Sequence, residues 1–416
     1  MKRYLLLLAA ALVVASISAR KITHEGYSFK TNEKELTAVL LKPSQPARGD
    51  IVIPDTIVID SLRYIVVEIA SAAFQGQAAL TSVVIPSTVE RIGARAFAAC
   101  ASLRSVELPS TLQEISDALF FNCISLTDIE LPTHLRKMGE GVFRGCTSLE
   151  SIVLPMIAEV PEETFQACRS LKDVTLPQTV TAIREGAFAD CSALTDIVLP
   201  MVRVIEDGAF WNCQNLSAID LPASLTKIED SVFENCRSLR FVRFPASIGR
   251  IDNRAFRGCS SLQEADLPDG LTALGNAVFE DCSAMTRIHL PKSLKVVPSA
   301  AFRGCSSLAA VELPASVQAI DGDAFCNCST IERLNLPPSV KAIGAKAFAG
   351  CSNLRDIYAS STFPAKMKKN SFSKDILRGG VLHVFPHSID AYRLDKTWSK
   401  FYNIVDYTRE EMDALK

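Results

Sequence analysis

At 416 residues, of which 48% are hydrophobic, the chain is too long for one compact core and can bury a large apolar interior. Its 44 basic and 46 acidic residues nearly cancel, and no lysine- or arginine-rich run stands out, which argues against nucleic acid as the natural partner. Beyond the N-terminal segment no apolar run reaches membrane-spanning length, so no transmembrane span is expected in the mature chain.

Residues 1–19 are typical of a secretory signal peptide. Two basic residues precede an apolar run, Tyr4 to Val14, that is too short to span a bilayer. Small residues follow, so cleavage is expected after Ser18 or Ala19; the alternative is a short anchor helix that is not cleaved. We therefore expect the protein to be secreted or held at the cell surface, and the periplasm remains open.

Residues 20–73 are expected to form an N-terminal cap. The segment Ile51 to Pro54 resembles the strand and proline of the repeats that follow. The stretch from Ile57 to Val67, with a turn near Asp60 and Ser61, predicts a hairpin that leads into the first repeat.

A phenylalanine column then gives the register of an internal repeat over residues 74–358, about 13 coils. Its spacing is 23 residues ten times and 22 residues twice. A cysteine follows three residues after twelve of these phenylalanines, and a proline recurs once per repeat from Pro86 to Pro337. The column consists of Phe74, Phe97, Phe120, Phe143, Phe165, Phe188, Phe210, Phe233, Phe256, Phe279, Phe302, Phe325 and Phe348.

One repeat can be interpreted physically. The alternation in Leu80–Pro86 predicts a strand with one face inward, and the proline ends it because proline has no N–H for a ladder. Val89 and Ile92 are expected inward on the next extended stretch, and Ala96–Cys100 is expected to be a tight helical turn. Stacked coils bury these side chains against each other. The pattern predicts a leucine-rich-repeat-like solenoid of stacked parallel β-strands with short helical turns, capped at both ends.

Residues 359–416 are expected to form a C-terminal cap, since the cysteine and phenylalanine columns end after Tyr358. Leu382–Pro386 is expected to be the last strand. Ile389 to Phe401 has helical spacing, with Tyr392 and Trp398 among its large apolar groups.

Thirteen cysteines in an exported protein suggest disulfides, but the column argues against them. Side chains stacked in successive coils point the same way at about 4.8 Å, whereas a disulfide needs Cβ atoms about 3.8 Å apart and turned toward each other. We therefore predict buried free thiols. Cys326 lies outside the column and is expected to be exposed, either as a reactive thiol or as a neutral surface residue.

The repeat resembles that of the BspA-like bacterial surface leucine-rich repeat family, C-x-x-L-x-x-I-x-L-P-x-x-L-x-x-I-x-x-x-A-F. Cys191–Pro200 matches its first half, and the resemblance covers roughly Ile51 to Tyr358. It implies a surface protein, in a family associated with adhesion to host matrix proteins, co-aggregation and innate immune recognition.

No motif for chemistry appears: there is no repeated calcium loop, phosphate loop or nucleophile elbow. His383 and His387 are too far apart in an extended segment to favour a metal site. We therefore predict no catalytic residue, no metal ligand and no cofactor, and not an enzyme.

Two columns are expected on the solvent face of the parallel strands, free of packing roles. They are mainly acidic in the first two-thirds, and basic groups enter from Arg243 onward, beside the aromatic Phe241. Trp211, on the turn after Phe210, is a second such aromatic. The alternative for either aromatic is packing on a neighbouring coil, and the alternative for the face is a surface that serves only solubility. The predicted partner-binding residues are Phe241, Arg243, Glu264, Asp266, Arg287 and His289.

These features lead to the hypothesis of an exported, non-catalytic, adhesin-like recognition protein. Its partner would be a protein, such as a host matrix protein or another bacterial surface protein. The alternative is a structural envelope or surface spacer without a specific ligand.

Overall fold

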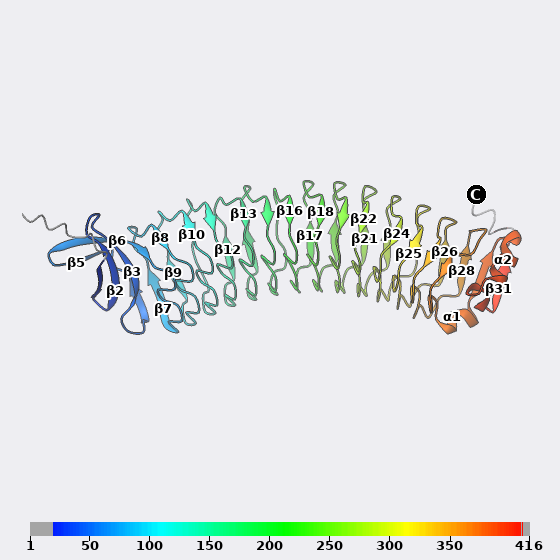
Figure 1. The fold of residues 1–416 in the computed structure, drawn as a ribbon, viewed down its shortest axis with the longest axis horizontal. Coiled ribbons are helices and arrows are strands. Elements are labelled where there is room, and N and C mark those ends of the chain that lie inside the picture. Colours follow the sequence, from blue (N-terminus) through cyan, green and yellow to red (C-terminus); the bar gives the residue numbers. More distant parts are fainter. Residues whose placement is uncertain (1–19, 409, 411–416) are drawn as a thin grey trace, which may run out of the picture.

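The computed structural model describes residues 20–408 and residue 410. The predicted signal peptide therefore lies outside the described residues. The chain forms one long, gently curved rod of stacked coils, with strands at the N-terminal end and a small group of helices at the C-terminal end (Figure 1). The predicted solenoid of stacked parallel strands is confirmed.

The N-terminal end is a sheet in the order β1-β2-β3-β6-β5. The expected hairpin is formed by β5 and β6, which pair antiparallel around a turn at Asp60 and Ser61. Strand β6 also pairs in parallel with the first coil, so this sheet runs directly into the solenoid. The strands are β1 (Arg20–His24), β2 (Tyr27–Asn32), β3 (Thr37–Pro43), β4 (Arg48–Val52), β5 (Thr56–Ile59) and β6 (Leu62–Ile69).

The coils contribute to two ladders of parallel strands, except that the segments 128–130, 196–198 and 310–312 form no strand in the first ladder. The first ladder has its middle residue turned inward and its flanking residues turned to solvent, and we call its solvent side the long-strand face. Its strands in the coils are β7 (Ala79–Val84), β9 (Ser105–Glu107), β12 (Ser151–Val153), β14 (Asp173–Thr175), β17 (Ala218–Asp220), β19 (Phe241–Arg243), β21 (Glu264–Asp266), β23 (Arg287–His289), β26 (Arg333–Leu336) and β28 (Asp356–Ala359).

The second ladder consists of two-residue strands whose second residue is usually buried, and we call its solvent side the short-strand face. The strands are β8 (Arg91–Ile92), β10 (Glu114–Ile115), β11 (Lys137–Met138), β13 (Glu159–Val160), β15 (Ala182–Ile183), β16 (Val204–Ile205), β18 (Lys227–Ile228), β20 (Arg250–Ile251), β22 (Ala273–Leu274), β24 (Val296–Val297), β25 (Ala319–Ile320), β27 (Ala342–Ile343) and β29 (Lys366–Met367).

The segments around the phenylalanines are not helical, and that expectation was wrong. Ala96–Cys100 is a run of turns, flanked and interrupted by residues with positive φ, Arg95 at 58° and Ala99 at 58°. Such left-handed residues prevent a continuous helical ladder. The backbone instead bonds to the next coil, as in Phe97 N to the carbonyl oxygen of Leu119 at 3.1 Å. Stacking therefore satisfies the polar groups that a helix would satisfy internally.

The phenylalanine column forms the centre of the core. Consecutive rings stack with centroids 5.1 to 6.0 Å apart and nearly parallel planes. Contrary to expectation, the column does not end at Phe348: Phe372 stacks on it at 5.1 Å, and β29 pairs with β27 below it. An irregular coil without a cysteine thus continues the solenoid, and its longer spacing concealed it in the sequence.

The C-terminal end closes the rod with buried aromatics. Trp398 is fully buried and donates from Nε1 to the carbonyl oxygen of Ala365 at 2.7 Å, while the Tyr392 hydroxyl donates to that of Ser361 at 3.1 Å. The expected last strand is β30, but β31 follows it in the same parallel ladder, because the chain returns after the helices. The elements are α1 (Lys374–Gly379), β30 (Val381–Val384), η1 (Pro386–Ser388), α2 (Ile389–Leu394), η2 (Trp398–Lys400) and β31 (Asn403–Asp406).

None of the helices in the described part of the chain has the length and apolar character required to cross a bilayer.

Candidate binding surface

The six residues predicted to bind a partner lie on three neighbouring strands of the long-strand face. Strands β21 and β23 place Glu264 beside Arg287 and Asp266 beside His289. Strand β19 lies next to β21 and carries the remaining two residues. The parallel register brings side chains 23 residues apart into direct contact, because each coil repeats the same outward positions.

Phe241 is the exposed aromatic group among the six residues. Its side chain is 53% exposed, and the residue opposite it on β17 is Ala218, which is too small to cover the ring. Val242, turned inward between Phe241 and Arg243, is packed against the core and anchors the strand. The fold therefore holds an aromatic ring in solvent on the two-stranded parallel sheet β17-β19.

Charged side chains surround the ring in pairs. Arg287 contacts Glu264 at 2.6 Å, and Arg243 contacts Asp220 at 3.9 Å. Both pairs are largely exposed, so each contributes only about 0–1 kcal/mol to stability. Their main effect is to arrange charge of both signs around Phe241.

The long-strand face has further apolar positions that the sequence analysis did not single out. Val153 and Val198 are 68% and 75% exposed and occupy the same outward column as Arg243. The signal was present in the sequence as two valines in a column of mainly polar residues. In that column Thr175 lies between the two valines and Asp220 lies between Val198 and Arg243, so the valines are isolated apolar positions and do not continue the Phe241 surface.

At the C-terminal end of the same face, side chains of neighbouring strands pack on one another. The Arg333 guanidinium lies 4.0 Å from the ring centroid of Tyr358, and that ring stacks on His383 at 4.2 Å. His383 Nε2 is 2.9 Å from Asp356 Oδ1, while His387 stacks on Phe385 instead. The structure therefore does not bring the two histidines into one site, and no metal-ligating group of three or more residues occurs in residues 20–408.

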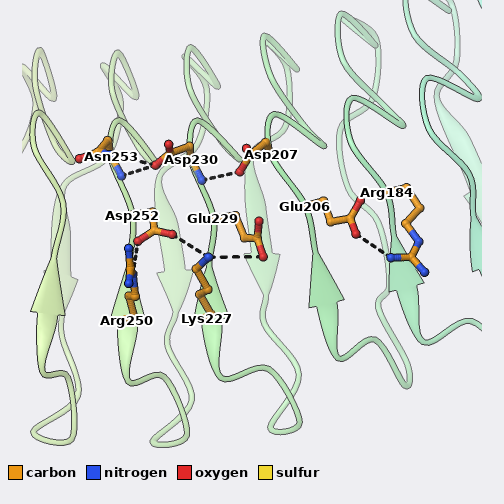
Figure 2. A network of polar contacts seen from close by, with 9 residues as sticks. All are labelled: Arg184, Glu206, Asp207, Lys227, Glu229, Asp230, Arg250, Asp252 and Asn253. Carbon is orange, nitrogen blue, oxygen red and sulfur yellow. Dashed lines mark hydrogen bonds and ion pairs between the residues drawn. The ribbon is translucent and has the colours of Figure 1, made fainter.

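The short-strand face carries charge networks whose members bond one another (Figure 2). Arg184 bridges Glu159 at 2.5 Å and Glu206 at 2.6 Å. These hydrogen bonds raise the pKa of the arginine further above its ordinary value. Each such bridge joins successive coils.

Lys227 makes the second bridge, to Asp252 at 2.9 Å and Glu229 at 3.5 Å, and Arg250 also bonds Asp252 (Figure 2). Burial acts to raise the pKa of Asp252, but hydrogen bonds from Lys227 and Arg250 outweigh it and hold that pKa below the usual value. Burial raises the pKa of Glu229. These carboxylates serve coil-to-coil contacts, which leaves the long-strand face as the better candidate for a ligand.

A side-chain ladder runs beside these networks. Asp207 Oδ1 accepts from the backbone N–H of Asp230 at 3.0 Å, and Asp230 Oδ1 accepts from that of Asn253 at 2.7 Å (Figure 2). The equivalent bond from Asn276 N to Asn253 Oδ1 measures 2.9 Å. The polar column therefore caps backbone groups of the following coil, a structural role.

Trp211 is separate from the Phe241 surface. It is 36% exposed and lines a hollow of about 420 Å³ on the turn side, with Glu163, Glu185 and Asp207 among its neighbours. No residue of the predicted six lines this hollow.

All thirteen cysteines are free, and the twelve of the column are buried, as expected. Burial raises the pKa of Cys100 to about 11 and that of Cys168 to about 12. The expectation that Cys326 is exposed was wrong: it is partly buried, and burial and the nearby Asp323 raise its pKa. A raised pKa lowers the thiolate fraction, so reactivity is disfavoured at this position.

The family model for the BspA type leucine rich repeat region matches the chain in six copies, over residues 67–195, 182–309 and 272–379. The chain belongs to the BspA-type leucine-rich repeat family. No curated protein matches its sequence.

Solved structures support this assignment. The BspA-type chain is similar to a leucine-rich repeat protein from Bacteroides ovatus, with 28% identity, a TM-score of 0.71, and coverage of 84% of this chain and 99% of that one. It is also similar to a leucine rich cell surface protein from Faecalibacterium prausnitzii, with 28% identity, a TM-score of 0.55, and coverage of 82% and 95%.

The pneumococcal vaccine antigen PcpA shares the fold at 18% identity, with a TM-score of 0.50 and coverage of 94% of this BspA-type chain and 99% of that one.

Proposed function

We propose that this BspA-type protein is exported and works, without catalysis, as a recognition protein at or beyond the cell surface. Its partner would be a protein, bound on the long-strand face across strands β17 to β23. The observation that carries the proposal is the Phe241 ring, 53% exposed on a paired strand, with the ion pairs Arg243–Asp220 and Arg287–Glu264 on the same and neighbouring strands.

Interface centres are commonly built from an aromatic anchor within a polar rim. Here the anchor is held by the β-ladder, so little conformational entropy is lost when a partner covers it. Composition on this face can follow a ligand because these side chains carry no packing role.

Two observations support export. The composition of residues 1–19 is that of a signal peptide. The similar protein from Faecalibacterium prausnitzii is described as a cell surface protein. A host matrix protein or another bacterial surface protein is the partner class that this location would offer.

The binding proposal is tested by replacing Phe241 and Arg243 together, once by alanine and once by serine. Wild type and variants are immobilised, exposed to a detergent extract of host matrix and to extracts of other bacterial surfaces, and the captured proteins are identified by mass spectrometry. A partner captured by wild type and lost by both variants supports the proposal. Asp128→Ala with Glu130→Ala is the matched control, because it alters the same two columns in a distant coil.

Capture that is equal in all variants, with unchanged thermal unfolding, would show that this surface is not the binding site. Complete absence of capture would favour the spacer without a ligand. Protease shaving of intact cells tests location independently, and a chain that resists shaving until the cells are lysed would contradict surface exposure.

A further inference from the structure

A basic hollow lies at the C-terminal end of the rod, far along the chain from Phe241. It measures about 540 Å³ and is formed by the segment after β29, the start of α1 and the end of η2. Four lysines line it, and no lining residue is acidic: the basic residues are Lys368, Lys369, Lys374 and Lys400.

The backbone beneath the lysines is firmly held. Lys368 N donates to the carbonyl oxygen of Ile343 at 2.9 Å, which continues the short-strand ladder. The buried Ser371 hydroxyl lies 2.8 Å from the carbonyl oxygens of both Gly344 and Lys368. Phe372 then enters the core column. The two adjacent lysines are therefore displayed from a fixed turn.

The other two lysines come from α1 and η2, which a backbone hydrogen bond holds together. Lys374 begins α1, whose cap is the Ser373 hydroxyl, an acceptor for Ile376 N at 3.4 Å. Lys400 ends η2, and just beyond it Tyr402 N donates to the carbonyl oxygen of Leu377 in α1 at 3.0 Å. The tertiary fold thus brings Lys400 to a segment that lies about thirty residues earlier.

These lysines differ from the basic residues that bridge carboxylates elsewhere in the molecule. In the coils, Lys227 and Arg257 each contact two carboxylates. Within residues 20–408, none of the four lysines around the hollow forms an ion pair, whereas ion pairs occur along most of the rod from Arg20 to His383. The nearby Asp395 is engaged instead by Thr397 and the backbone of Trp398.

Like charges gathered without counter-charges repel one another, and a concave site focuses the resulting field on an anion. A ligand with several acidic groups would relieve that repulsion. Phe372 is only 3% exposed, so the hollow offers no aromatic platform for stacking nucleic-acid bases. Its apolar lining, Met367 and Leu377, is partly buried and does not project as a membrane-inserting group would.

We propose that this hollow binds an anionic polysaccharide through its carboxylate, sulfate or phosphate groups. The site is independent of the long-strand face and of the protein partner proposed for it. The sequence alone does not reveal this hollow, because the basic residues of 366–374 form too short a run to stand out, and only the fold adds Lys400.

The test uses the whole mature protein and a fluorescein-labelled heparin oligosaccharide, with binding followed by fluorescence anisotropy over a series of salt concentrations. In the Lys368→Glu, Lys369→Glu variant we expect the affinity to fall about tenfold or more, and the slope of log affinity against log salt to fall by about one per lysine lost. Lys368→Arg with Lys369→Arg should retain binding.

The matched control is Lys292→Glu with Lys295→Glu, which changes the net charge equally on exposed positions of a distant coil. Lys374→Gln with Lys400→Gln provides a second variant from the other side of the hollow, and thermal unfolding by circular dichroism checks that each variant is folded. Equal losses in site and control variants, or none in either site variant, would overturn the proposal. So would tighter binding of a DNA duplex or of phosphatidylglycerol vesicles than of the oligosaccharide.

Discussion

The thiol of Cys236 donates a hydrogen bond to the carbonyl oxygen of Phe210, 3.2 Å away in the preceding coil. The same contact recurs for every cysteine of the column, from Cys100 with Phe74 to Cys351 with Phe325. A thiol is small, apolar enough to be buried and still a weak donor. This combination explains how cysteine can fill the column without forming disulfides.

Thiol accessibility should follow from this burial. Native protein at neutral pH should react slowly with a maleimide at no more than one site, Cys326, because it alone is partly exposed. Unfolded protein should react at all thirteen. The measurement is intact mass after timed labelling, and Cys326→Ser should abolish the native signal. Rapid labelling of several thiols in folded protein, or a peptide map that shows disulfides, would contradict the buried column.

Stability should decline in alkali. Burial raises the pKa of Cys100 to about 11 and that of Cys168 and Cys351 to about 12. Above the ordinary value of 9.0 the unfolded chain loses thiol protons that the folded chain keeps, so unfolding becomes easier as pH rises. For each such thiol the free energy of unfolding falls by about 1.4 kcal/mol per pH unit between the ordinary pKa and the raised pKa.

The urea midpoint should therefore be insensitive to these thiols below pH 9 and fall above it. Cys168→Ala with Cys191→Ala should make the alkaline decline shallower, while Cys326→Ser should change it less. A midpoint that is constant from pH 8 to pH 11 in wild type would rule out the thiol contribution.

Close stacking in the turns predicts a specific glycine requirement. Gly258 has φ +73°, and a Cβ there would lie 2.5 Å from Asn235 Oδ1 of the preceding coil. Gly76 has the same conformation, φ +74°, with open space around it. Gly76→Ala should therefore lower the free energy of unfolding by about 1 kcal/mol, through backbone strain alone. Gly258→Ala should lower it further, because the new Cβ also meets Asn235.

Urea denaturation of the two alanine variants measures the difference. Adding Asn235→Gly to Gly258→Ala should recover the excess, because glycine tolerates the φ of 63° at position 235 and the two side chains no longer meet. Equal losses in the free energy of unfolding for the two glycine replacements would show that the Asn235 side chain moves aside without a measurable energetic penalty.

Arg257 should be important for local stability because it lies between two carboxylates. It contacts Glu234 at 3.1 Å and Glu280 at 2.9 Å, and those side chains are only 9% and 13% exposed. Arg257→Met would remove the arginine from both poorly solvated carboxylates, although Arg303 would still lie 3.5 Å from Glu280, and should cost about 2–4 kcal/mol. Arg243→Ala, which breaks the exposed pair with Asp220, should cost under about 1 kcal/mol. Hydrogen exchange in the adjoining coils locates the effect, and similar costs for the two variants would contradict it.

The sequence by itself determined the solenoid, its register and its inward columns. Residues such as Phe256 and Cys259 recur at a period that only stacking can bury, and strand alternation assigns Phe241 and Arg243 to the solvent side. These properties depend on local spacing, and each repeat of the pattern gives the same spacing again. The candidate binding surface was likewise visible as an exception within a repeated column.

Only the tertiary structure decided what happens where the repetition weakens. Left-handed residues such as Arg95 and Ala99 replace the expected helical turn because inter-coil hydrogen bonds satisfy that backbone. Phe372 joins the core column without a cysteine to mark it, and Lys400 reaches the lysines near β29 through the return of the chain after α2. Such contacts join residues that share no period, so their proximity follows from packing of the whole end of the rod and not from any local pattern.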